Sequence, residues 1–245
     1  MKNLLHSLLP LSLLLTPTFS LPTSQDFPPF PITDLLDSDL TIEEYADQLS
    51  SRGLTKRQYN GDTYNQLTDG SACREISLIF ARGTTSPGNV GAAGSEGPTF
   101  FNALASRLGG TSRLAIQGVN YSASVLGFLQ GGDPAGSTTT YNLINDVAAR
   151  CPSTKIVLSG YSQGAQLVHN AAQRLSTSAA ARINAVVTFG DADRDEGFGP
   201  IAASKILIIC HDGDNICDNG IIITPAHSNY EIDAPAAADF VVARV

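Results

Sequence analysis

The sequence has no tryptophan, a single methionine and few basic residues. Its 15 lysines and arginines stand against 23 aspartates and glutamates, which gives a formal net charge of −8. Proteins that bind nucleic acid or anionic membranes carry basic patches, and this sequence contains no basic stripe. We therefore expect no nucleic-acid partner.

Long apolar runs are also absent. A membrane-spanning helix needs about 20 apolar residues, whereas the apolar stretch at the N-terminus covers only residues 4–15. Lys2 precedes this stretch, and small or helix-breaking residues follow it at 16–20, which is the order of a secretory signal peptide. We expect a signal peptide over residues 1–20, no membrane span, and a secreted, extracellular protein.

Residues 21–57 are acidic and rich in proline near their start. They hold seven acidic residues against three basic ones, and they end at Lys56 and Arg57, a dibasic pair of the kind that secretory-pathway proteases cut. We interpret this stretch as a pro-segment, so that one mature domain spans residues 58–245. The alternative is an acidic arm that stays attached, and a secreted chain starting at Leu21 would favour it.

The four cysteines form no C-x-x-C pair, so a zinc site is a weak alternative. An even number of cysteines in a secreted chain predicts disulfides. Four cysteines allow three pairings, and the short spacing favours Cys210 with Cys217, which leaves Cys73 with Cys151. Asn120 begins a glycosylation sequon, whose use the sequence does not decide.

Apolar, β-branched runs alternate with helical patterns along the mature part. This alternation predicts an α/β fold, a three-layer α/β/α sandwich with about five parallel strands. Function in such sheets gathers beyond the carboxyl ends of the strands, and no loop there is long enough for a separate helical lid. We therefore expect a lidless site open to solvent. The predicted strands are 75–81, 113–119, 155–159, 183–189 and 205–210, and the predicted helices lie near 98–108, 139–150, 163–177 and 235–244.

The strand at 155–159 leads into Gly160-Tyr-Ser162-Gln-Gly164 and then into a helix. This is G-x-S-x-G in the strand–turn–helix context that a nucleophile requires. The turn crowds the backbone, so a side chain at either glycine would collide with neighbouring structure, and the strained turn lifts the Ser162 hydroxyl clear of the sheet. We predict that Ser162 is a catalytic nucleophile.

A serine hydroxyl needs a positioned base, and four histidines are available. His6 lies in the predicted signal peptide. His169 follows Ser162 by seven residues, about 10 Å along a helix, which is too far for a hydrogen bond, and we expect a packing or helix-surface role. His211 directly follows a strand. Chain order in this architecture is nucleophile, acid, base, and His227 satisfies it best.

The acid has two serious candidates. One is the cluster Asp191, Asp193 and Asp195, which resembles a solvated loop. The other is Asp214, between Cys210 and Cys217, with Asp212 and Asp218 as lesser competitors. A triad acid must be held rigidly to fix the imidazole tautomer. A short disulfide loop supplies that rigidity, so we favour Asp214.

The developing oxyanion needs two hydrogen-bond donors. The backbone N–H of Gln163, next to the nucleophile, is the first. The second is expected in the loop after the first strand, where Thr84 offers an N–H and a hydroxyl. An ordinary Ser/Thr turn explains that loop equally well.

Together these motifs resemble the fungal cutinases, in the group that also holds acetylxylan esterases. The resemblance covers Cys73 to the C-terminus. It rests on four pieces: Phe80-Ala-Arg-Gly-Thr84, Gly160-Tyr-Ser-Gln-Gly164, Cys210-His-Asp-Gly-Asp214-Asn-Ile-Cys217, and His227. It implies a small lidless α/β hydrolase with a Ser162–Asp214–His227 triad and oxyanion donors at Thr84 and Gln163. It also implies the disulfides Cys73–Cys151 and Cys210–Cys217, and no metal or cofactor. Some members support the oxyanion hydroxyl with an Asn from the region 120–136, which has no match here.

Two apolar stretches are expected to flank the nucleophile as an exposed groove for the acyl chains of insoluble polyesters such as cutin. We expect a monomeric serine esterase acting on cutin-type polyesters and on short-to-medium chain esters. The alternatives are an acetylxylan esterase and a non-catalytic surface protein on the same fold. For single residues of the two stretches, simple packing against the core is the better explanation. They are Val125, Leu126, Phe128 and Leu129 in one, and Ile221, Ile222, Ile223 and Pro225 in the other.

Overall fold

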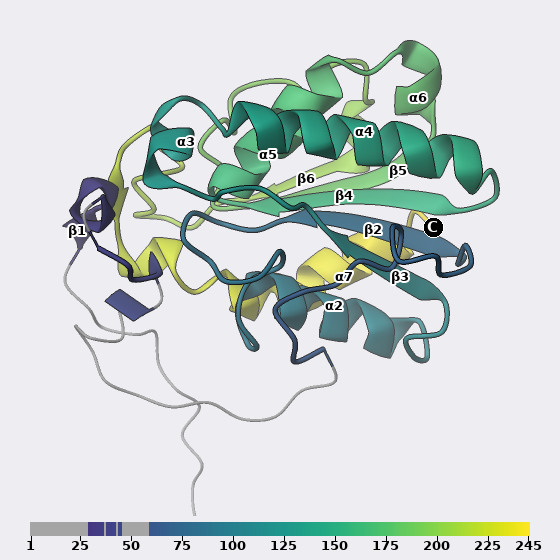
Figure 1. Ribbon diagram of the computed structural model, residues 1–245, viewed down its shortest axis with the longest axis horizontal. Coiled ribbons are helices and arrows are strands. Elements are labelled where there is room, and N and C mark those ends of the chain that lie inside the picture. Colours follow the sequence, from purple (N-terminus) through teal and green to yellow (C-terminus); the bar gives the residue numbers. More distant parts are fainter. Residues whose placement is uncertain (1–28, 37, 43, 46–58) are drawn as a thin grey trace, which may run out of the picture.

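Five apolar runs of the sequence form the strands of one parallel sheet (Figure 1). The computed structural model describes residues 29–36, 38–42, 44–45 and 59–245. The predicted signal peptide and the dibasic pair Lys56–Arg57 lie outside the described residues. The strand order is β3-β2-β4-β5-β6, which confirms the predicted five-stranded α/β architecture. The strands are β2 (Ile76–Ala81), β3 (Leu114–Gly118), β4 (Lys155–Tyr161), β5 (Ile183–Phe189) and β6 (Ile206–Ile209).

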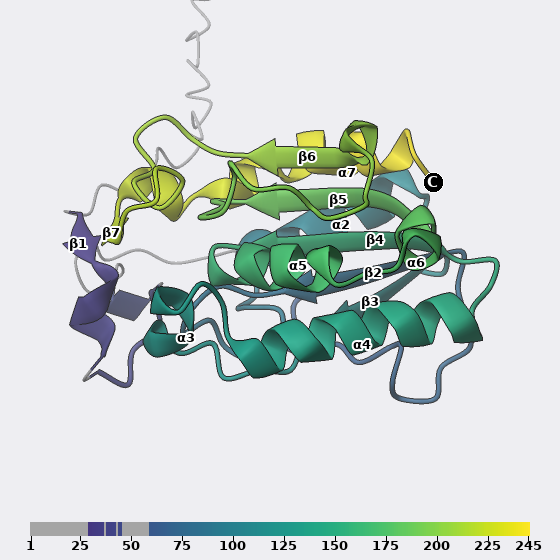
Figure 2. The same ribbon diagram turned by 90° about the horizontal axis from the view of Figure 1, so that it is seen from above.

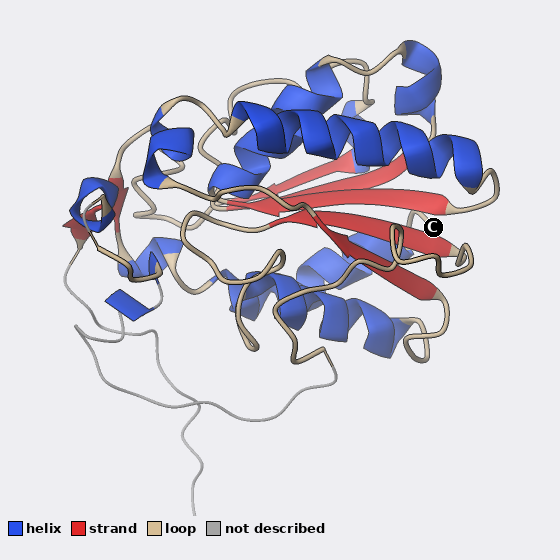
Figure 3. Cartoon of the chain, viewed as in Figure 1, coloured by secondary structure: helices blue, strands red, loops and turns tan. Residues whose placement is uncertain are grey.

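Helices cover both faces of the sheet, so the domain has three layers (Figure 3). One face carries α2 (Glu96–Arg107) and α7 (Ala234–Val242), and the other carries α4 (Pro134–Arg150), α5 (Gln163–Gln173) and α6 (Thr177–Ala181). Side chains alternate along a strand, and in β2 Leu78 and Phe80 face one helical layer while Ile79 and Ala81 face the other. This double burial explains why the strands read as continuous apolar runs.

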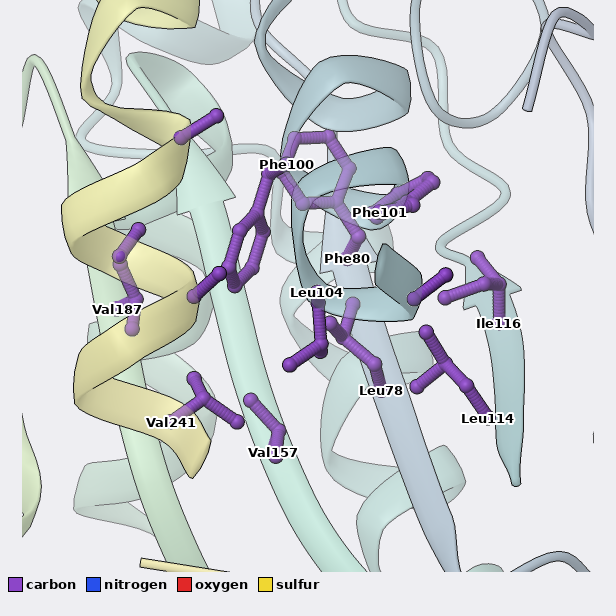
Figure 4. Close-up of a cluster of buried hydrophobic side chains, with 14 of the residues drawn as sticks. Leu78, Phe80, Phe100, Phe101, Leu104, Leu114, Ile116, Val157, Val187 and Val241 are labelled. Atoms are coloured by element: carbon purple, nitrogen blue, oxygen red, sulfur yellow. The ribbon is translucent and has the colours of Figure 1, made fainter. Parts of the chain in front are cut away.

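Aromatic rings fill the layer between the sheet and α2 (Figure 4). Phe80 and Phe101 pack edge to face with ring centroids 5.3 Å apart, and Phe100 lies 5.6 Å from Phe189. All four rings are almost completely buried. Burial of each such side chain contributes about 1.5–3 kcal/mol, so this cluster anchors the sheet that carries the site.

The predicted helix boundaries differ from the observed ones where side chains cap a helix. The helix expected near 139–150 begins earlier, because Asp133 accepts a hydrogen bond from the Gly136 N–H at 2.6 Å and Pro134 occupies the first turn. The helix expected over 163–177 ends at Gln173. Ser176 then caps α6 by accepting from the Ala179 N–H.

Most of the remaining elements gather at the carboxyl ends of the strands, whereas the 3-10 turn η2 (Ala203–Lys205) directly precedes β6. A short helix, α3 (Val125–Leu129), and a two-residue strand, β7 (Ile222–Ile223), lie at the end of the sheet toward which the arrowheads of β5 and β6 point (Figure 2). From the N-terminal region, β1 (Phe30–Pro31) and the 3-10 helix η1 (Ile32–Leu35) lie at the same end. Two further 3-10 turns are η3 (Pro225–His227) and η4 (Tyr230–Asp233).

Both disulfides pair as the sequence predicted. Cys73–Cys151 joins the segment before β2 to the end of α4, and Cys210–Cys217 closes the loop after β6. The Cα atoms are 5.7 and 6.1 Å apart, within the usual range for disulfides. Across the described residues, no helix has the length and apolarity needed to cross a membrane.

Candidate active site

Ser162 occupies the sharp turn between β4 and α5. Its backbone has φ +54° and ψ −121°, a conformation that side-chain-bearing residues rarely adopt. The flanking glycines permit the turn. A Cβ on Gly160 would lie 2.4 Å from the carbonyl carbon of Gly164, and one on Gly164 would lie 1.9 Å from the carbonyl oxygen of Ala81. The structure thus gives the two glycines the steric reason expected from the sequence.

His227 and Asp214 lie in series with Ser162. The Nε2 atom of His227 is 3.0 Å from the Ser162 hydroxyl, and its Nδ1 atom is 2.9 Å from Oδ2 of Asp214. All three side chains are buried. The structure therefore brings together the three residues that the sequence selected as nucleophile, base and acid.

Asp214 is fixed from three further directions. It sits in the loop closed by Cys210–Cys217, and its Oδ1 accepts from the Ile216 N–H at 2.9 Å. Burial opposes its negative charge, but hydrogen bonds from His227, Tyr230 and the Ile216 N–H outweigh burial, so the pKa of Asp214 is lowered. The carboxylate is accordingly ionised near neutral pH and holds the imidazole with an N–H on Nδ1.

Two tyrosines support the triad, and the sequence analysis missed both. The Tyr230 hydroxyl donates to Asp214 Oδ2 at 2.7 Å and accepts from the His211 N–H at 2.8 Å. The Tyr161 hydroxyl donates to the carbonyl of His227 at 2.9 Å, and its ring stacks on the imidazole. Burial and the Asp214 charge raise the pKa of Tyr230, so it stays a donor. The sequence offered one signal for each: Tyr161 directly precedes Ser162, and Tyr230 follows His227 by three residues.

Thr84 and Gln163 lie together beside the nucleophile. Within the part of the chain that the structure describes, no group accepts a hydrogen bond from the backbone N–H of either residue, which leaves both donors available. The Gln163 side-chain amide donates to the Thr84 hydroxyl at 2.7 Å and to the Ser124 carbonyl at 2.9 Å. A Cβ on Gly127 would lie 2.6 Å from the amide oxygen of Gln163, so the glycine leaves room for it.

The loop that carries Thr84 is braced by a buried cation. The guanidinium of Arg82 donates to the carbonyls of Ser86 and Tyr121 at 2.6 and 2.9 Å and lies over the Tyr121 ring. Its described hydrogen bonds all go to backbone carbonyls, at Ser86, Val119 and Tyr121. Arg82 thereby ties the loop after β2 to the loop after β3.

The expectation for His169 and Asp191 was wrong in one respect. Asp191 does not lie in a solvated loop, because it and His169 are completely buried and joined by a 3.0 Å hydrogen bond. Thr188 also donates to Asp191 at 2.6 Å. The Asp191 carboxylate is hydrogen-bonded inside the protein by Thr188 of β5 and His169 of α5. We had expected water to solvate it.

The other acid and base candidates lie apart from Ser162. Asp195 and Asp212 are exposed, and Asp218 pairs with Arg194 at the surface. His211 pairs with Asp233 at 2.6 Å and stacks on Tyr230. It thus contacts a residue that supports the triad without contacting Ser162.

The two apolar stretches beside the site are only partly exposed. In one, Leu126 and Leu129 are exposed while Val125 and Phe128 are buried, and in the other Ile221 is exposed while Ile223 is buried. With the N-terminal region present, Ser162 and His227 have no exposed surface. The solvent-open site was expected for the mature domain, residues 58–245, without that region. In the described loops after the strands, the elements that do not pack on the sheet are short: α3 has five residues, and η3 and η4 have three and four. None of them is a separate helical lid.

Comparisons with known proteins identify the family. The sequence pattern of the Cutinase family matches residues 72–245. The chain belongs to the cutinase family. It is 49% identical to Cutinase CUT2 of Pyricularia oryzae over 197 residues, which cover 78% of this chain and 90% of that protein. It is also 49% identical to a cutinase of Botryotinia fuckeliana over 170 residues, or 69% and 83% of the two chains.

Solved structures agree with this placement. A Trichoderma reesei cutinase in complex with a phosphonate inhibitor matches with a TM-score of 0.69 and 44% identity, over 75% of this chain and 80% of that one. An acetylxylan esterase matches with a TM-score of 0.58 at 24% identity, over 71% and 99%, which shows a shared fold. This cutinase is therefore a carboxylic ester hydrolase with an α/β-hydrolase fold.

Proposed function

We propose that this cutinase is a secreted serine esterase in which Ser162, His227 and Asp214 act as a triad through an acyl-enzyme. The observation that carries the proposal is the pair of contacts on one imidazole, 3.0 Å to the Ser162 hydroxyl and 2.9 Å to Asp214. That geometry suits a base that removes the serine proton through Nε2 while Nδ1 stays held. Entry into the secretory pathway is supported by the two disulfides and by the N-terminal sequence pattern.

In the first half-reaction the Ser162 oxygen attacks the ester carbonyl, and His227 takes the serine proton. The lowered pKa of Asp214 keeps its carboxylate charged, so it stabilises the imidazolium that forms. His227 then gives the proton to the departing alcohol. In the second half-reaction water attacks the acyl-enzyme by the same route, which returns Ser162 and releases the acid. Each step is carried out by groups of this chain and by water.

The tetrahedral oxyanion is stabilised by the backbone N–H groups of Gln163 and Thr84 and by the Thr84 hydroxyl. Because the Gln163 side-chain amide donates to that hydroxyl oxygen, the hydroxyl hydrogen is free to point at the oxyanion. The amide thus supplies the support that some cutinases obtain from an asparagine in the region 120–136. One donor of this kind is worth about 10²–10³ in kcat.

The substrates proposed are cutin-type polyesters and short-to-medium chain esters. The apolar residues on both sides of Ser162 favour acyl chains over the polar surroundings of an acetylated sugar, and the curated relatives are named cutinases. A series of nitrophenyl esters on the processed protein tests this, with Ser162→Ala as the control. We expect turnover of butyrate and longer esters and its loss in the control.

The same series tests the alternatives. Turnover confined to the acetate ester would favour an acetylxylan esterase, the activity named for a structural neighbour of the same fold. Absence of turnover with every ester, in correctly processed protein, would favour a non-catalytic surface protein. Turnover that survives Ser162→Ala would overturn the assignment of the nucleophile.

A further inference from the structure

The N-terminal region lies across the end of the sheet that carries the triad. We call its described residues (29–36, 38–42 and 44–45) the covering segment. β1 pairs antiparallel with β7, with Phe30 opposite Ile223 and Pro31 opposite Ile222. The Ile32 N–H also donates to the Ile221 carbonyl at 2.8 Å. Figure 2 shows β1 beside β7, at the carboxyl ends of the strands. The covering segment therefore adds a strand to the loop that leads into His227.

Apolar side chains of the covering segment are buried against both stretches that flank the nucleophile. Phe30, Ile32, Leu35 and Ile42 expose at most 4% of their surface, which is unusual for a segment outside the folded domain. Their cluster includes side chains from α3, from β7 and from the Cys210–Cys217 loop with its surroundings. The domain residues in it are Val125, Phe128, Ala192, Ile216 and Ile223.

The covering segment also touches the loop of the proposed oxyanion hole. The Ile42 N–H donates to the Thr85 hydroxyl at 2.6 Å, and Thr85 directly follows Thr84. Thr41 and Glu44 form a reciprocal capping box at this point, each side chain accepting from the other's N–H at 2.9 Å. The contact is thus made by an ordered turn.

The covering segment contacts elements that adjoin a completely buried nucleophile. Contacts of the covering segment reach β7 before His227, α3, and Thr85 beside Thr84, while Ser162, His227 and Thr84 have no exposed surface. A cleft of about 440 Å³ lies between residues 35, 36 and 38–40 of the covering segment and residues 122–126 of the domain.

We propose that the covering segment is an intramolecular occupant of the apolar surface between α3 and β7, where the proposed esterase binds the acyl chain, and that this occupation keeps the uncut chain inactive. This rests on the proposed esterase function. The apolar side chains of the segment take the place of an acyl chain. Its backbone, in β1, pairs with the edge of β7. Removal of the segment exposes the groove and Ser162 together.

Proteolysis supplies the removal. Hydrolysis of the Arg57–Gln58 peptide bond by a protease that recognises dibasic pairs consumes one water and leaves the segment bound only through its contacts. While it is joined to the domain, its effective concentration is on the order of millimolar. After the cut it dissociates on dilution. Cutting and dilution together therefore activate the enzyme.

The test compares cut and uncut protein on a soluble ester. A Lys56→Ala, Arg57→Ala double variant of residues 21–245 stays uncut, and the processed wild type is its partner. We expect kcat/KM for nitrophenyl butyrate to be at least about tenfold lower in the uncut protein. Equal values would overturn the inference. No activity in the processed protein would instead contradict the proposed esterase function.

Two adjacent leucines provide a matched pair of variants. Leu35 is buried in the cluster at 3% exposure, whereas Leu36 is 53% exposed. In the uncut background, Leu35→Asp should bring kcat/KM to within about threefold of the processed enzyme, and Leu36→Asp should leave it low. If the two variants behave alike, the buried contacts do not restrain the enzyme and the inference fails. Cutting either variant in a cleavable background yields the same chain from residue 58, which controls for folding.

A synthetic peptide of residues 21–57 gives an independent readout. Added to the processed enzyme, it should raise KM for nitrophenyl butyrate without changing kcat, because it competes for the groove. The Leu35→Asp peptide should inhibit at least about tenfold less strongly than the Leu36→Asp peptide. Inhibition that lowers kcat at unchanged KM would contradict occupation of the groove.

Discussion

Two buried histidine–aspartate pairs follow neighbouring strands of the sheet, Asp191 after β5 and Asp214 after β6. Their hydrogen bonds are nearly equal in length, 3.0 Å to His169 and 2.9 Å to His227. Each carboxylate also accepts from a hydroxyl, of Thr188 in one pair and of Tyr230 in the other. Burial and the acid–base partners alone therefore do not distinguish them.

The difference lies at the second nitrogen of each imidazole. His227 presents Nε2 to the Ser162 hydroxyl at 3.0 Å, where a proton can be exchanged. His169 presents Nδ1 to the Gly197 carbonyl at 3.4 Å, which can only accept, and its ring stacks on Phe198. One pair is built to move a proton and the other to hold two elements together. The group that faces the second imidazole nitrogen therefore distinguishes the catalytic pair from the structural one: a serine hydroxyl for His227 and a backbone carbonyl for His169.

Removing each histidine should separate the two pairs most strongly. His227→Ala is expected to lower kcat by about 10⁴–10⁶, because the serine loses its base, and it should also lower the free energy of unfolding, because it leaves Asp214 buried without its imidazole partner. His169→Ala should keep kcat within about tenfold but lower the free energy of unfolding by about 3 kcal/mol, because it leaves Asp191 buried without its partner. Ester kinetics and urea unfolding on the same two samples measure both effects. A larger loss of kcat in His169→Ala than in His227→Ala would reverse our assignment.

The support of the oxyanion donor should give a smaller effect. Gln163→Met keeps the length of the side chain but removes the amide that donates to Thr84, and we expect kcat to fall about 10–100-fold at nearly unchanged KM. Gln166→Met, at another buried glutamine of α5, is the matched control and should keep kcat within about threefold.

A double-mutant cycle tests whether the amide acts through Thr84. Because both groups serve one hydroxyl, Gln163→Met combined with Thr84→Val should lose little more kcat than Thr84→Val alone. Losses that simply multiply would show that the Gln163 amide does not position Thr84.

The smallest predicted effect is on the pH dependence of stability around the His169–Asp191 pair. Burial, with the charges of Asp191 and Glu196, raises the pKa of Asp193 to about 6, against the opposing effect of His169. Between about pH 4 and 6 the native state therefore binds more protons than the unfolded state, so this contribution to stability falls as pH rises. The raised pKa of His169, where burial is outweighed by the Asp191 bond, acts in the same direction above pH 6.5.

Asp193→Asn removes the titrating carboxyl of Asp193, and with it that residue's contribution to the pH dependence of stability. Relative to wild type, the variant should gain about 1–2 kcal/mol of unfolding free energy between pH 4.5 and 7, as measured by urea unfolding at the two pH values. Asp195→Asn, at an exposed position nearby, should leave the difference unchanged. A variant at Asp193 that follows the wild-type curve would contradict the raised pKa.

The sequence predicted the fold well because buried parallel strands leave a direct signal. Both faces of β2 are buried, so the whole run is apolar and its type and position are readable. The helix ends were less accurate because caps such as Asp133 and Ser176 add residues that the apolar pattern does not contain. The disulfides followed from spacing and resemblance.

At the site, the order of the motifs indicated Ser162, Asp214 and His227. The sequence did not predict the residues that hold them in place. Tyr161 and Tyr230 act through hydroxyls aimed by the fold, and the Gln163 amide meets Thr84 from 79 positions away along the chain. The burial of Asp191 also depends on tertiary contacts that composition does not reveal. The covering of the nucleophile by residues far upstream was not predicted for the same reason.

Covalent labelling of the processed protein with an alkyl phosphonate ester tests the central claim most directly. The account predicts one adduct per chain, located by mass spectrometry on Ser162, with loss of esterase activity in proportion to labelling and much slower labelling of His227→Ala. An adduct on another residue that accompanies the loss of activity would contradict the assignment of Ser162 as the nucleophile of the triad.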